Sequence, residues 1–153
     1  MTEYRCYTFT HFMLSSIQQG IQSGHAAMEL VNKYYDNQNP TYVVDEHNWE
    51  VVLDWIQNDK TIVCLNGGNS ESMFEWEKFL NTYENPFPWV SFHEDESSME
   101  GILTSIALIL PARIYDADVD QQYWGGMASV VPGEFTAWEW QLFQRVKTAP
   151  LAR

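Results

Sequence analysis

Basic residues are scarce in this chain of 153 residues, which has eight Lys and Arg against 21 Asp and Glu. The formal net charge is −13, and the basic side chains are scattered at positions 5, 33, 60, 78, 113, 145, 147 and 153. Proteins that bind long RNA or DNA present clustered Lys and Arg to the phosphates. The composition therefore argues against tight binding of long nucleic acids, although a fold can still concentrate a few cations locally.

Cysteines and long apolar runs are also few. The two cysteines, Cys6 and Cys64, lie in strand-like segments without a C-x-x-C or metal-ligand spacing, so we expect buried, reduced thiols and no metal site. The longest apolar run, ILTSIALIL, is too short to span a bilayer. The N-terminal MTEYRCYTF lacks the basic-then-apolar pattern of a signal peptide. These absences predict a soluble protein in the reducing cytoplasm, without a membrane-spanning segment.

Apolar residues make up 45% of the chain, which is enough for one domain with a substantial core. Periodicity predicts strands at 4–14, 60–65, 88–95 and 104–110, and helices at 15–35, 45–58 and 73–83. This β-α-α-β-α-β-β order predicts a mixed α/β sheet of about four strands packed by helices, formed by residues 1–112. The apolar run 60–65 suits a buried and parallel strand.

Residues 113–153 have a different pattern, an acidic loop followed by an amphipathic helix. GEFTAWEWQLFQRVKT, at 133–148, places one apolar face on a helix, formed by Phe135, Trp138, Leu142 and Val146. We expect this tail to pack back on the core or to form a surface for a partner.

The helix expected at 15–35 has three distinct stripes. Polar side chains recur along one of them, at Gln18, Gln22, His25 and Glu29. A second stripe has the small residues Gly20, Gly24 and Ala27, which predict a close backbone contact, and a third is apolar, with Ile17, Ile21, Met28 and Val31. Ser15 or Ser16 can cap this helix, with Gln18 or Gln19 completing a capping box. The polar stripe is a candidate site, and His25 alternatively is a histidine bonded at a helix–sheet interface.

Two further segments have features of binding or catalysis. The turn-like NGGNSES, with Asn66, Gly67 and Gly68, precedes a helix and could hold a phosphate on backbone amides; alternatively it is a strand-to-helix turn capped by Asn69 or Ser70. An acidic cluster begins at Glu94 and Asp95. It is a solvated loop, or else Asp95 orients a base or substrate at the end of a strand.

With these elements in order, residues 4–112 resemble the type II peptidyl-tRNA hydrolase family. The resemblance rests on QSGHAA at 22–27, on the strand KTIVCLNG, on V-S-x-x-x-D at 90–95, and on the final strand SIALILP. It implies an α/β hydrolase that cleaves an acyl ester on the 3′ end of a tRNA or a nucleotide-type substrate, without a cofactor. By this resemblance His25, Asp95 and Gln22 are catalytic, Gln18, Glu29, Asn66, Gly67 and Gly68 bind substrate, and a homodimer is allowed.

This chain departs from the family at two places. The position of the family's lysine falls on Gln18, which cannot supply a charge, and the Asp-Ala-Gly-x-Thr signature is replaced by residues 95–99, DESSM. A histidine base with an aspartate could still activate water, and Gln18 or Gln22 could hold the developing oxyanion more weakly than a lysine. The alternative function is a lapsed family member, of viral or mobile-element origin, that sequesters a small nucleotide-like ligand in the same cleft.

Overall fold

A four-stranded mixed sheet organises the part of the chain that the computed structural model describes, which is residues 2–35, 46–94, 101–116 and 135–152. The strand order is β2-β1-β4-β3, with β1 parallel to β2 and antiparallel to β4, and β3 antiparallel to β4. The carboxyl ends of strands β1, β2 and β3 therefore lie on the same side of the sheet as the start of β4. The elements are β1 (Tyr4–His11), α1 (Ser16–Tyr34), α2 (Glu46–Asp54), the π-helical turn η1 (Trp55–Asp59), β2 (Ile62–Gly68), α3 (Ser70–Leu80), β3 (Trp89–His93), β4 (Leu103–Pro111), α5 (Ala112–Tyr115) and α7 (Ala137–Thr148). The predicted order of elements, the mixed α/β sheet and the parallel placement of the strand after 60 are confirmed.

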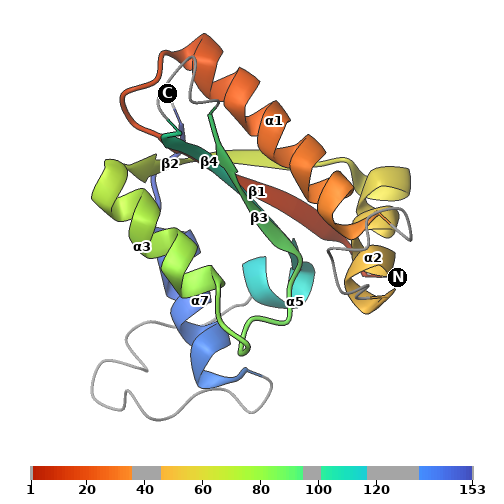
Figure 1. The fold of residues 1–153 in the computed structure, drawn as a ribbon. Helices are drawn as coiled ribbons and strands as arrows, with labels where there is room; N and C mark the ends of the chain where they lie inside the picture. The colour runs from red at the N-terminus through yellow and green to blue at the C-terminus, as the bar shows by residue number, and fades with distance from the viewer. Residues whose placement is uncertain (1, 36–45, 95–100, 117–134, 153) are drawn as a thin grey trace.

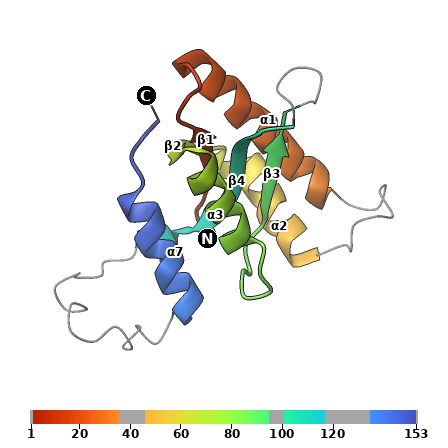
Figure 2. The same cartoon turned by 60° about the vertical axis from the view of Figure 1, so that its left-hand side comes forward.

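Helices cover both faces of this sheet, with α1 and α2 on one face and α3 and α7 on the other (Figures 1 and 2). On the α1 face, Leu30, Val52 and Trp55 pack over Cys6 and Ile109. On the opposite face Phe9 stacks on Trp76, at 4.1 Å between ring centroids, within a larger apolar cluster. No described helix combines the length and the hydropathy that crossing a membrane requires.

The prediction of an apolar face on α1 that includes Ile17, Ile21 and Met28 is wrong for these three residues. Ile17, Ile21 and Met28 are 77%, 50% and 63% exposed, and the buried side chains are Gln19, Gln22, Ser23, Ala26, Ala27 and Leu30. The reason lies in the sheet below, where β1 and β4 present buried hydroxyls that need partners. Thr8 Oγ1 lies 2.8 Å from Ser23 Oγ, and Thr104 Oγ1 donates to the side-chain oxygen of Gln22 at 3.0 Å. A polar helix face satisfies these groups where an apolar face could not.

The close packing expected at Gly20 and Gly24 is also wrong, since a Cβ at either position would meet nothing within 4 Å. The predicted capping box is confirmed, with Ser15 Oγ accepting from Gln18 N and Gln18 Oε1 accepting from Ser15 N, each at 3.2 Å.

Strand β2 extends further than expected, through Asn66, Gly67 and Gly68, so the segment predicted as a turn completes the strand. A Cβ on Gly67 would overlap Met73 Sδ, and Gly68 has φ of +84°, so packing and backbone conformation require both glycines. Asn69 then caps α3 as one of the two predicted caps, because its side chain accepts from Ser72 N at 2.9 Å.

The C-terminal segment packs back on the sheet. Trp138 and Leu142 are buried in the larger apolar cluster, with Phe135 and Val146 against it, which is the predicted face of α7. After α7 the backbone runs along the outer edge of β2, with hydrogen bonds from Asn66 N to Pro150 O and from Ala152 N to Cys64 O. This cover satisfies backbone groups that an edge strand would otherwise expose.

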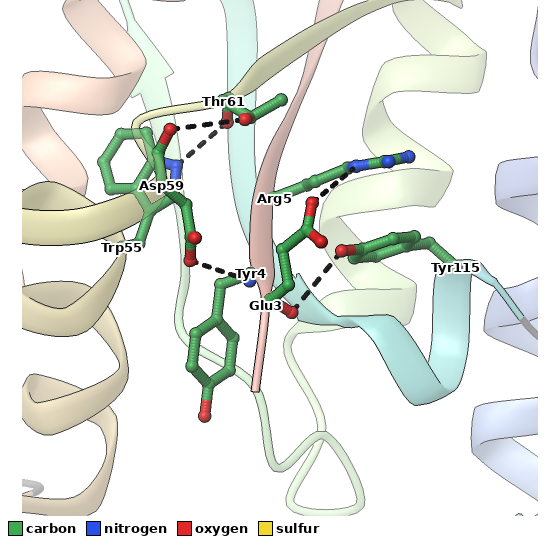
Figure 3. Close-up of polar contacts among 7 residues, drawn as sticks. All are labelled: Glu3, Tyr4, Arg5, Trp55, Asp59, Thr61 and Tyr115. Carbon is green, nitrogen blue, oxygen red and sulfur yellow. Dashed lines mark hydrogen bonds and ion pairs between the residues drawn. The ribbon is translucent and has the colours of Figure 1, made fainter. Parts of the chain in front are cut away.

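The start of β1 is anchored from both sides, as Figure 3 shows. Tyr4 N donates to Asp59 of η1 at 2.9 Å, and Tyr115 of α5 donates to the carbonyl of Glu3 at 3.5 Å. Arg5 lies 3.9 Å from Glu3 and 4.1 Å above the Tyr115 ring. Arg5 therefore stabilises the start of β1 through its contacts with Glu3 and Tyr115.

Candidate functional site

The candidate site is centred on the amide of Gln22, where the buried face of α1 meets the end of β3 and the start of β4. Gln22 Nε2 donates to Glu94 Oε2 at 2.6 Å, and Thr104 Oγ1 donates to Gln22 Oε1 at 3.0 Å. Gln22 is buried, so both halves of its amide need these partners.

A strand irregularity brings Thr104 to this amide. In the pairing of β3 with β4, Phe92 lies opposite Ser105 and His93 lies opposite Leu103. Thr104 therefore has no residue opposite it on β3. Such bulges redirect side chains near sites. Thr104 and its neighbour Ser105 consequently both bond to Gln22, one to its side chain and the other to its carbonyl.

His25 lies one turn further along α1 and is half-buried beside Phe92, with ring centroids 5.0 Å apart. Its Nδ1 is 3.4 Å from Gln22 Oε1. An ionised carboxylate only accepts hydrogen bonds, so Glu94 fixes the NH₂ group of Gln22 toward itself and the oxygen toward His25. The Nδ1 of His25 must then donate, which leaves the lone pair on Nε2. In this tautomer Nε2 is the nitrogen that can accept a proton.

A second histidine, His11, has the opposite arrangement at the same edge of the sheet. Met13 N donates to its Nδ1 at 3.1 Å, so Nε2 bears the proton and donates to Ser70 Oγ at 2.9 Å. Burial lowers the pKa of His11 from its ordinary value of 6.5, which favours this neutral form. Although the pair resembles a serine with its base, the tautomer prevents His11 from taking the Ser70 proton.

The structure separates the site residues predicted from the sequence. His25 and Gln22 lie together, Glu29 lies half-buried one turn beyond His25, and Asp95 is outside the described residues. Gln18 is exposed and bonds to Ser15, which directs its side chain toward the start of α1 and away from Gln22.

Asn66, Gly67 and Gly68 lie elsewhere, on the face covered by α3. They line a cavity of about 510 Å³ together with Ser72 and Arg145, among others. The substrate-binding residues inferred from the resemblance are thus divided between two faces of the sheet.

Three residues of the Gln22 site and of the cavity on the α3 face are not among the predicted site residues: Glu94, Thr104 and Arg145. Glu94 stands next to the aspartate that was singled out, and only the structure shows which of the two contacts Gln22. Thr104 begins the predicted strand at 104–110, and Arg145 is one of the scattered basic residues. Within residues 2–35, 46–94, 101–116 and 135–152, no three His, Cys, Asp or Glu side chains are grouped to hold a metal.

No protein-family model matches this chain, and a comparison with curated proteins gives no match.

Proposed function

We propose that this protein hydrolyses an acyl ester on the 3′ end of a tRNA or on a smaller nucleotide-type substrate, with His25 as general base. The observation that carries the proposal is the chain Glu94–Gln22–His25, which fixes the base tautomer of the imidazole. An amide oxygen held in place can orient a histidine as a carboxylate does elsewhere.

In the proposed reaction, His25 Nε2 removes a proton from a water molecule as that water attacks the ester carbonyl. The tetrahedral intermediate then collapses, the bond between the acyl carbon and the ribose oxygen breaks, and the imidazolium returns the proton to the leaving hydroxyl. Gln22 Oε1 stabilises the imidazolium through its Nδ1–H, and the charge of Glu94 acts through the amide. General-base assistance of this kind contributes roughly 10²–10⁴-fold in rate.

The test is release of the acyl group from a model peptidyl-tRNA and from a short aminoacyl-nucleotide ester. His25→Ala should reduce the rate by roughly 10²–10⁴-fold. His47→Ala, which changes an exposed histidine on α2, is the matched control and should leave the rate unchanged. No turnover, or turnover indifferent to His25, would reject the mechanism.

A second candidate is a binding protein that sequesters a small nucleotide-like ligand at the same place. Gln18, at the position where the family has its lysine, is committed to the helix cap, and no Lys or Arg bonds to Gln22, Glu94 or His25 among the described residues. A site without a cation can bind by hydrogen bonds while lacking a group for the oxyanion. Thermal stabilisation by mono- or cyclic nucleotides that is lost in His25→Ala, without ester cleavage, would favour this candidate over the hydrolase.

A further inference from the structure

The cavity on the α3 face has an unusual charge for this protein. It lies where the end of β2 and the start of α3 meet the last turn of α7, and Arg145 is the one charged residue among the described residues that line it. The chain as a whole has 21 acidic residues against eight Lys and Arg. A cation-lined hollow without a carboxylate therefore stands out against an acidic surface, and it favours an anionic ligand.

Arg145 is held in place by aromatic rings. Its guanidinium carbon lies 4.4 Å from the centroid of Phe79 and 5.8 Å from that of Trp76. By contrast, Arg113 pairs with Glu139 at 2.6 Å and Arg5 pairs with Glu3, whereas Arg145 pairs with no carboxylate in the described part of the chain. Stacking leaves the N–H groups at the guanidinium edge available for a phosphate or carboxylate.

The rest of the wall supplies hydrogen-bonding groups and an aromatic surface. Asn66, Ser72 and Thr148 contribute polar side chains, each of which also makes a hydrogen bond within the protein. Phe12, which is 49% exposed, stacks on His11, with the ring centroids 5.3 Å apart. The volume of about 510 Å³ is within the range of about 300–1,000 Å³ that small-molecule sites occupy. Packing at Gly67 and the positive φ of Gly68 account for the glycines of β2, so Arg145 and Phe12 are the residues that indicate a ligand.

We infer that this cavity binds a small phosphate ester that has an aromatic ring, with the phosphate on Arg145 and the ring against Phe12. The site is on the opposite sheet face from His25 and does not depend on the hydrolase proposal. It explains why an arginine is stacked and unpaired in a strongly acidic chain.

The test is calorimetric titration of the full chain with adenosine monophosphate as the probe. Wild-type protein should bind the probe saturably, and adenosine, which lacks the phosphate, should bind at least tenfold more weakly. Arg145→Gln should weaken binding of the monophosphate at least tenfold. Lys147→Gln is the matched control, because it removes the same charge from the same helix turn outside the cavity, and it should change affinity less than twofold.

Further variants separate this inference from loss of folding and from the proposed function. Arg145→Lys keeps the charge but loses the planar fork, so it should bind with intermediate affinity and the wild-type unfolding midpoint. His25→Ala should bind the probe as wild type does. The inference fails if no saturable binding occurs, if adenosine binds as well as its monophosphate, or if Arg145→Gln and Lys147→Gln weaken binding equally.

Discussion

Replacing Gln22 with leucine keeps a similar volume on the buried face of α1 but removes every hydrogen bond of the amide. The bond to Glu94 is charge-assisted and worth about 1.5–3 kcal/mol, and the bond from Thr104 is worth about 1 kcal/mol. Burial of the leucine side chain returns about 1.5 kcal/mol. We therefore expect Gln22→Leu to lower the free energy of unfolding by about 1–2.5 kcal/mol, or about 2–10 °C in thermal midpoint.

Urea unfolding followed by tryptophan fluorescence measures this change, with the slope of free energy against urea compared between variants. Gln141→Leu, on the exposed face of α7, is the control and should stay within about 0.5 kcal/mol of wild type. The reasoning is refuted if Gln22→Leu is as stable as wild type, or if the control loses as much stability.

Three more predictions concern stability, each measured by urea unfolding. Burial lowers the pKa of His11 below its ordinary 6.5, so the unfolded chain binds a proton first as the pH falls. The resulting stabilisation is complete above about pH 6.5 and is lost as the pH falls through the lowered pKa. Between about pH 7 and 5, the free energy of unfolding should therefore fall more for wild type than for His11→Gln. Parallel curves of this free energy against pH would contradict the prediction. Gly67→Ala places a Cβ against Met73 Sδ and 3.2 Å from Thr10 O, and should cost about 1–3 kcal/mol, so an unchanged midpoint would show that the strand can shift. Thr136→Ala removes the side chain that caps α7 at Glu139 N and should cost about 1 kcal/mol, whereas an effect near zero would mean that the cap is dispensable.

Local signals in the sequence were sufficient for the order of elements and for the caps that start two of the helices. The capping box of Ser15 with Gln18, the cap at Asn69 and the apolar face of α7 each depend on residues within one or two helix turns. Such features are readable because the interacting groups are close along the chain.

The orientation of α1 could not be read in the same way, because three of its large apolar residues, Ile17, Ile21 and Met28, are exposed. Which face is buried depends on Thr8 and Thr104, whose hydroxyls contact Ser23 and Gln22 and which belong to two different strands of the sheet. The same limit applies to the site, where a bulge in the pairing of β3 with β4 aims Thr104 at Gln22. Long-range register decides these contacts, and a single sequence does not contain it.

In the proposed mechanism Glu94 and Gln22 hold His25 as a base, whereas His11 is held in the opposite tautomer. Long-range ¹H–¹⁵N correlation spectra of the histidine rings at neutral pH measure the tautomers directly. We predict a proton on Nδ1 of His25 with Nε2 unprotonated, a proton on Nε2 of His11, and loss of the fixed His25 tautomer in Gln22→Leu. A proton on Nε2 of neutral His25 in the wild-type protein would contradict the account.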